Sequence, residues 1–219
     1  MKPFRKLSAR VAPLNRANVD TDQIIPKQFL KRIERTGYGE FLFFDWRRIQ
    51  DGPNAGDPDP EFVLNHPHHA GAEILLAGKN FGCGSSREHA AWALSDYGFR
   101  CVIAPTFADI FHSNAGKNGI LLITLQEEHV DLLHKRAASL PGYQLHVSLE
   151  DQTVNDDHGF FASFTTDPFR RECLLEGLDD IGLSMRHSAV LDDYEQRHDK
   201  DFWLAARPGE TANAGGGLQ

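Results

Sequence analysis

The sequence predicts an α/β protein with a mixed sheet, in which barrel-like strands are flanked by helices. Between residues 73 and 138, short apolar runs alternate with helical patterns, a rhythm typical of parallel strands joined by crossover helices. Between residues 143 and 164, the runs become shorter and are separated by Asp, Asn and Gly, as in antiparallel hairpins. The chain has 219 residues, which is long enough to bury a sizeable core as one domain.

The first half of the chain contains one weak strand signal, followed by turn and helix signals. In the segment 26–35, the apolar residues Phe29, Leu30 and Ile33 recur at helical spacing, with a proline at its start. The expected elements are a strand at 7–11, a turn at 18–23, helices at 26–35 and 40–49, and a loop at 50–59.

The second half of the chain shows the α/β alternation. Strands are expected at 73–77, 101–104 and 120–124, and helices at 86–96, 107–114, 127–138, 167–176 and 188–202. Residues 1–206 are expected to form one domain with a C-terminal helical extension. The glycine-rich residues 207–219 are expected to be a disordered tail.

The composition argues against several classes of protein. The net charge of −8 disfavours nucleic-acid binding, because phosphate contacts need clustered Lys and Arg. No apolar run approaches the length that spans a membrane, and the basic start lacks the apolar core of a signal peptide. We therefore expect a cytoplasmic protein with no nucleic-acid or membrane partner.

The segment 78–91, Gly-Lys-Asn-Phe-Gly-Cys-Gly-Ser-Ser-Arg-Glu-His-Ala-Ala, carries most of the chemical information. Ser85 or Ser86 is expected to cap the helix that follows, with Glu88 completing a capping box. The free backbone N–H groups at this helix start, together with Arg87, form a site suited to a carboxylate or a phosphate. The alternative is an ordinary capped helix whose arginine points into water.

The glycines and cysteines of the chain refine this interpretation. Gly78, Gly82 and Gly84 suggest that something comes close to the backbone of this loop. The three cysteines, Cys83, Cys101 and Cys173, are too widely spaced for a disulfide framework or a metal site of their own. Cys101 and Cys173 are expected in the core, and Cys83 beside the helix start, where a thiolate is stabilised.

Two stretches of the sequence resemble a known family. The run Asn80-Phe-Gly-Cys-Gly-Ser-Ser-Arg-Glu-His-Ala90 is similar to the signature of the small, swivelling domain of the aconitase superfamily. The run Asn18-Val-Asp-Thr-Asp-Gln-Ile-Ile-Pro26 is similar to the second signature of that domain. The similarity is strongest to the small subunits of bacterial 3-isopropylmalate dehydratases, and it implies a swivelling β/β/α domain of the aconitase C-terminal type.

The resemblance also implies an activity. In the family, the first serine of the pair removes a proton next to a carboxylate, which would make Ser85 the base and Ser86 and Arg87 the substrate-binding residues. The implied reaction is the isomerisation of 2-isopropylmalate to 3-isopropylmalate through isopropylmaleate, a hydro-lyase step of leucine biosynthesis. The family holds a [4Fe–4S] cluster with three cysteines, a triplet that this sequence lacks. The implied partner is therefore a large, cluster-bearing subunit, with no cofactor or metal bound by this chain.

Other residues are expected near the site without a catalytic role. The residues of the two signatures that are expected near the site in this way are Asp20, Thr21, Asp22, Asn80, Gly82, Cys83, Gly84, Glu88 and His89. The two aspartates are expected to shape a turn, and His89 either orients the serine or packs the helix. In the family, the segment after the first signature helps recognise the variable side chain of the substrate. Phe29, Leu30 and Ile33 could therefore form an apolar wall for an isopropyl group, beside a solvated basic cluster of Lys27, Lys31, Arg32 and Arg35.

Three other interpretations stay open. One is a related hydro-lyase small subunit that acts on homoaconitate or a methylmalate. A second is a stand-alone cysteine hydrolase with Cys83 as its nucleophile. The third is a non-catalytic phosphate-binding module, although the loop lacks the Gly-Lys-Ser/Thr ending of a phosphate loop.

Overall fold

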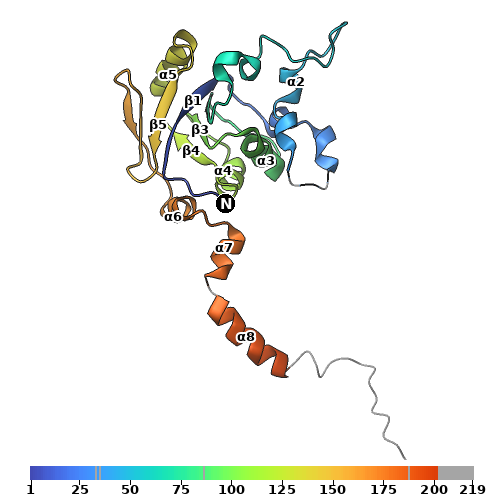
Figure 1. Ribbon diagram of the computed structural model, residues 1–219, viewed down its shortest axis with the longest axis vertical. Coiled ribbons are helices and arrows are strands. Elements are labelled where there is room, and N and C mark those ends of the chain that lie inside the picture. Colours follow the sequence, from blue (N-terminus) through green and yellow to red (C-terminus); the bar gives the residue numbers. More distant parts are fainter. Residues whose placement is uncertain (33, 35, 86, 187, 202–219) are drawn as a thin grey trace, which may run out of the picture. The chain divides into compact units, whose positions relative to one another are not determined.

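The computed structural model describes residues 1–32, 34, 36–85, 87–186 and 188–201. The chain divides into two compact units, Met1–Asp179 and Asp180–Gln219. Within the described residues, the first unit contains a seven-stranded sheet in the order β4-β3-β2-β1-β5-β6-β7 (Figure 1). Its strands are β1 (Lys6–Leu14), β2 (Ile74–Ala77), β3 (Cys101–Ala104), β4 (Leu121–Thr124), β5 (Gln144–Ser148), β6 (Thr153–Asn155) and β7 (Phe161–Ser163).

The sheet changes from parallel to antiparallel at β1. Strand β1 pairs with β2 in parallel, with Val11 opposite Ile74, and the parallel pairing continues through β3 to β4. On its other side, β1 pairs with β5 in the antiparallel direction, with Lys6 opposite Ser148, and the meander continues through β6 to β7. The predicted fold class, with parallel strands in the middle of the chain and hairpin strands after residue 143, is confirmed.

Helices cover both faces of the parallel strands. Alternate residues of a strand point to opposite faces, and in β2 Leu76 lies in a core with Leu133, whereas Leu75 lies in a second core with Leu94. The first core belongs to α5 and the second to α3 and α4, so both faces of the strands are buried, as in parallel sheets generally. The helices of this unit that follow β2 are α3 (Glu88–Tyr97), α4 (Asp109–Lys117), α5 (Glu127–Ser139) and α6 (Pro168–Glu176).

The long connection from β1 to β2 contains short helical turns in place of the two helices expected at 26–35 and 40–49. They are α1 (Thr21–Ile24), η1 (Lys27–Lys31), η2 (Tyr38–Phe41), α2 (Phe44–Arg47), η3 (Val63–Asn65) and η4 (Pro67–His69), where η marks a 3₁₀ helix. The prediction at 40–49 is wrong because Phe43 adopts a left-handed conformation, φ 49°, and its N–H bonds to the carbonyl of Ile24. Tertiary contact overrides the helical spacing here.

A buried carboxylate anchors the antiparallel part of the sheet. The side chain of Asp156 is fully buried and accepts a hydrogen bond from the hydroxyl of Tyr143 at 2.5 Å. It also accepts hydrogen bonds from Arg136 of α5 and from the backbone N–H groups of His158 and Phe160. The carboxylate thereby joins α5, the start of β5 and the turn after β6.

The second unit contains α7 (Asp180–Met185) and α8 (Ser188–Asp201). Helix α7 was not predicted, whereas α8 lies where a helix was expected. Residues 207–219, for which a disordered tail was expected, lie outside the described residues. Across the described ranges, no helix is both long enough and apolar enough to cross a membrane.

Candidate active site

Backbone hydrogen bonds join the two signature segments. The N–H of Thr21 donates to the carbonyl of Cys83, and the N–H of Gly82 donates to the carbonyl of Val19, each at 2.8 Å. Asn80 extends the contact, because its side-chain amide donates to the side-chain oxygen of Asn18 at 2.9 Å. Segments some 60 residues apart in sequence therefore form one structural element.

The first signature ends in a short, capped helix. The side chain of Asp20 accepts a hydrogen bond from the N–H of Gln23, and the side chain of Gln23 accepts one from the N–H of Asp20, which completes a capping box at the start of α1. The buried Thr21 then donates its hydroxyl to the carbonyl of Ser85 at 3.0 Å. The first signature thus fixes the backbone that carries the candidate base.

Ser85 does not cap the helix that follows it. Helix α3 begins at Glu88, and Arg87 stands at the N-cap position with φ −127° and ψ 118°, without a capping hydrogen bond from its side chain. The predicted capping box of Ser85 and Glu88 is therefore wrong, because the bond from Thr21 holds Ser85 in the loop, and the extended Arg87 delays the helix. Ser85 is exposed, and Ser86 lies outside the described residues.

The guanidinium of Arg87 is held by an aspartate of the first signature. Its Nη1 lies 2.5 Å from Oδ1 of Asp22, and the other carboxylate oxygen of Asp22 lies 3.1 Å from Nζ of Lys27. The side chain of Arg87 is only 17% exposed, whereas that of Lys27 is 72% exposed. One carboxylate therefore bridges a fixed cation and a cation at the surface.

The glycines of the second signature accommodate other parts of the protein. A Cβ added to Gly78 would lie 2.5 Å from the backbone carbonyl oxygen of Arg16. At Gly82, which has φ +78°, an added Cβ would lie 2.2 Å from the ring of Phe111. The predicted close approach to the backbone of this loop is confirmed at these two positions, and the atoms that approach it belong to the protein itself.

We predict that Gly82→Ala destabilises the protein by about 2–4 kcal/mol, because it adds a core clash to an unfavourable φ. Gly56→Ala is the matched control, since Gly56 also has a positive φ, +94°, but nothing within 4 Å of an added Cβ. It should cost only about 1 kcal/mol. Chemical unfolding measures the free energy of unfolding of both variants. Equal losses of stability would contradict a clash with Phe111 at position 82.

Cys83 and His89 do not have the properties of a catalytic nucleophile and its general base. Burial, together with the nearby charge of Asp20, raises the pKa of the Cys83 thiol, so the expected stabilisation of a thiolate is wrong. His89 packs against the rings of Tyr38 and Trp92. Burial, and next the charge of Arg87, lower the pKa of His89. These contacts support the helix-packing interpretation of His89 and disfavour a hydrolase based on Cys83.

The apolar residues after the first signature face one another. Phe29 stacks on Phe41 at a centroid distance of 4.1 Å and meets Phe44 edge-on at 4.9 Å. Leu30 is half-buried and packs with Phe29 against the core that contains α3. Ile33, the third member of the proposed wall, lies outside the described residues.

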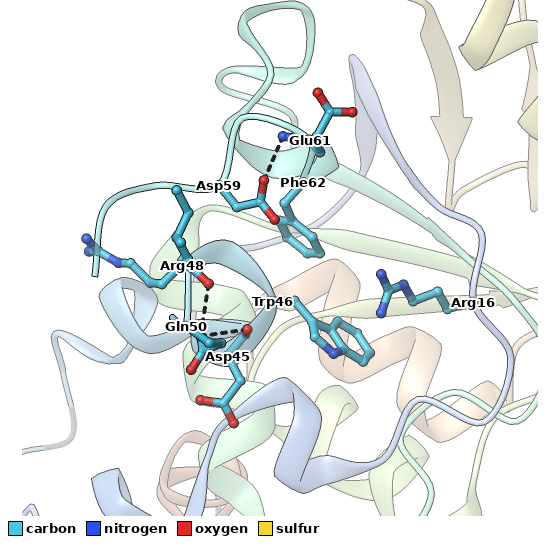
Figure 2. Close-up of a pocket in the computed structure, with 9 residues that line it drawn as sticks. Arg16, Asp45, Trp46, Arg48, Gln50, Asp59, Glu61 and Phe62 are labelled. Atoms are coloured by element: carbon cyan, nitrogen blue, oxygen red, sulfur yellow. Dashed lines mark hydrogen bonds between the residues drawn. The ribbon is translucent and has the colours of Figure 1, made fainter. Parts of the chain in front are cut away.

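Two other features do not form a competing site. The side chain of His69 is half-buried and bonds to the carbonyl of Val11, and no set of three or more metal-binding side chains occurs in the part of the chain that the structure describes. An open hollow of about 410 Å³ is lined by Arg16, Asp45, Trp46, Arg48, Ile49, Gln50, Asp59, Glu61 and Phe62 (Figure 2). Three carboxylates and two guanidinium groups line the hollow, and one guanidinium lies 4.3 Å from the ring of Trp46. Because negative groups outnumber positive ones, the hollow does not suit a diacid.

Comparison with known proteins gives the family. The sequence model of the Aconitase C-terminal domain matches residues 1–128. A 3-isopropylmalate dehydratase small subunit from Acidobacterium capsulatum is 65% identical over 213 residues, which cover 97% of this chain and 98% of that protein. The chain belongs to the family of 3-isopropylmalate dehydratase small subunits.

Further members of the small-subunit family and a solved structure agree. The small subunit from Koribacter versatilis is 59% identical over 90% of this chain and 100% of its own length. The crystal structure of 3-isopropylmalate dehydratase (leuD) from Methanocaldococcus jannaschii has a TM-score of 0.63 and 22% sequence identity, and the match covers 86% of this chain and 99% of that one. At this identity the crystal structure supports the fold alone.

The sequence did not reveal two contacts that shape this small-subunit site. The bond from Thr21 to Ser85 and the bridge from Asp22 to Arg87 both join the two signatures. Each signature could be recognised separately, but only their pairing in the fold shows which side chains meet. Lys27 was assigned to a solvated cluster, although its proximity to the first signature could have suggested a role at the site.

Proposed function

We propose that this chain is the small subunit of a hydro-lyase that isomerises 2-isopropylmalate to 3-isopropylmalate through isopropylmaleate. The observation that carries the proposal is the pairing of the two signatures, which positions the loop of Ser85 beside the ion pair of Arg87 and Asp22. The names of its relatives support the substrate. We also propose that the enzyme serves leucine biosynthesis in the cytoplasm.

Ser85 is proposed to remove the proton next to a substrate carboxylate. A serine hydroxyl is a weak base, so its alkoxide needs electrostatic stabilisation. The backbone N–H groups at the start of α3 and the guanidinium of Arg87 can supply it. Arg87 and Ser86 are proposed to bind the carboxylate, since the planar guanidinium can donate two parallel hydrogen bonds to it.

The [4Fe–4S] cluster is proposed to be held by a large subunit. The residues of this chain do not fit such a cluster. Cys101 and Cys173 are buried, in β3 and α6, and Cys83 lies in the signature loop. We therefore propose a heteromer in which this chain contributes the proton-abstracting and carboxylate-binding half of the active site.

The proposal is tested by producing this chain together with a cluster-bearing large subunit and assaying the purified complex without oxygen. The complex should consume 2-isopropylmalate, with isopropylmaleate as an intermediate, and neither subunit should turn over alone. Homocitrate and citramalate provide the comparison. A complex with higher kcat/KM for either of these would assign the chain to a related hydro-lyase.

We predict that Arg87→Lys raises the KM for 2-isopropylmalate about tenfold or more, because the planar pair of donors is lost. Lysine keeps the positive charge beside Asp22, so folding and assembly should be preserved. Steady-state kinetics of the complex measures the effect. An unchanged KM would show that Arg87 does not bind the carboxylate.

A further inference from the structure

Lys27 is placed to act in the same site as Arg87. It lies five residues after Asp22, in η1, and its Nζ is 3.1 Å from a carboxylate oxygen of Asp22. Arg87 contacts the other oxygen of that carboxylate. Since both cations touch a single carboxylate group, they are close enough to bind the two ends of one small diacid.

The side chains of Lys27 and Arg87 differ in how tightly they are held. The side chain of Arg87 is mostly buried and held by Asp22, whereas that of Lys27 is 72% exposed. A lysine ammonium on a flexible stem can turn from one carboxylate to another at little cost, because exposed ion pairs contribute only about 0–1 kcal/mol. The neighbouring Arg32 is engaged elsewhere, with Glu34 and over the ring of Phe41.

The charge of the cluster also suits a dianion. Two cations share one carboxylate, so the cluster of Lys27, Asp22 and Arg87 carries one excess positive charge. The proposed substrate has two carboxylates, and Arg87 is the one cation assigned to them so far. Lys27 is a second cation of this chain within reach of the same ligand.

We propose that Lys27 binds the second carboxylate of the substrate, and that Asp22 holds its ammonium group in the free subunit. This inference rests on the proposed function. It makes Lys27 a substrate-binding residue that selects diacids over monoacids, and Asp22 the counter-ion that keeps both cations at the site.

The test compares diacid and monoacid binding in the assembled enzyme. Lys27→Met should raise the KM for 2-isopropylmalate and the inhibition constant of succinate about tenfold each, the effect of losing one charge-assisted hydrogen bond. The inhibition constant of butyrate, a monoacid of the same length, should not change. The value of kcat should stay within about threefold, and Lys27→Arg should behave nearly as the wild type.

Lys135→Met is the matched control, since Lys135 is an exposed lysine of α5, whose residues pack in the other core. It should leave all constants unchanged. Lys27→Gln provides a second variant should the methionine impair assembly. Unchanged KM and succinate inhibition in an active Lys27 variant would overturn the inference and leave the proposed function intact. An equal loss of succinate and butyrate binding would also overturn it, and a wild-type complex inactive on 2-isopropylmalate would instead refute the proposed function.

Discussion

Ser85→Ala should lower kcat of the assembled enzyme by about 10²–10⁴-fold, the range that a positioned acid–base group supplies. The substitution removes a hydroxyl from an exposed loop residue, while the bond from Thr21 is made to the backbone carbonyl and is kept. Folding, assembly and KM should therefore change little. The measurement is turnover of 2-isopropylmalate, together with NMR detection of deuterium uptake at the substrate carbon in D₂O.

Ser95→Ala is the control for the base assignment. Ser95 is an exposed serine of α3, so its loss should leave turnover and exchange unchanged. Ser86→Ala should chiefly raise KM. If Ser85→Ala retained exchange at the wild-type rate while Ser86→Ala abolished it, the second serine would be the base.

Asp156→Ala should cost about 3–5 kcal/mol of unfolding free energy, because it removes a buried carboxylate that accepts several hydrogen bonds. It leaves the hydroxyl of Tyr143 and two backbone N–H groups without their acceptor, and unpaired buried groups are costly. The neighbouring Asp157→Ala is the control, since that carboxylate is 81% exposed and pairs with His146 at the surface. Asp157→Ala should change the unfolding free energy by less than about 1 kcal/mol. A similar loss in both variants would contradict the role of Asp156 as an anchor of the sheet.

The same carboxylate should make stability depend on pH. Burial raises the pKa of Asp156, but the hydrogen bonds from Tyr143, Arg136 and two backbone amides outweigh burial and lower the pKa to about 2, from an ordinary value of 3.8. A depressed pKa stabilises the folded state above the ordinary value, and that contribution is lost as the pH falls toward 2. Between about pH 4 and 2, the wild type should lose more unfolding free energy than Asp156→Asn, which has no carboxyl group to titrate.

The parallel half of the fold could be predicted because its signals are local. Each strand is an apolar run, and each helix that follows has its own period, so the predicted strand at 101–104 agrees with β3 and the predicted helix at 127–138 lies within α5. The connection from β1 to β2 could not be predicted in the same way. Its aromatic residues have helical spacing, but they pack against one another, and the bond from Phe43 to Ile24 reverses the local backbone.

The site was predictable only as two separate segments. The sequence pointed to Ser85 and Arg87, yet it placed the helix start two residues early and missed the role of Asp22 as the partner of Arg87. The group around Asp156 gave no signal, because its members are scattered over 136–160. Such contacts depend on how distant segments pack, which no local pattern contains.

The bonds that join the two signatures have a consequence for how selectivity can diversify. Those of Thr21 to Cys83 and of Gly82 to Val19 run between peptide groups, and so they involve no side chain of residues 28–31. Replacements among residues 28–31, which include Phe29 and Leu30 of the proposed apolar wall, are therefore expected to alter which malate homologue is accepted while the loop of Ser85 keeps its place. A new substrate range is therefore best sought by varying residues 28–31 while both signatures are kept unchanged.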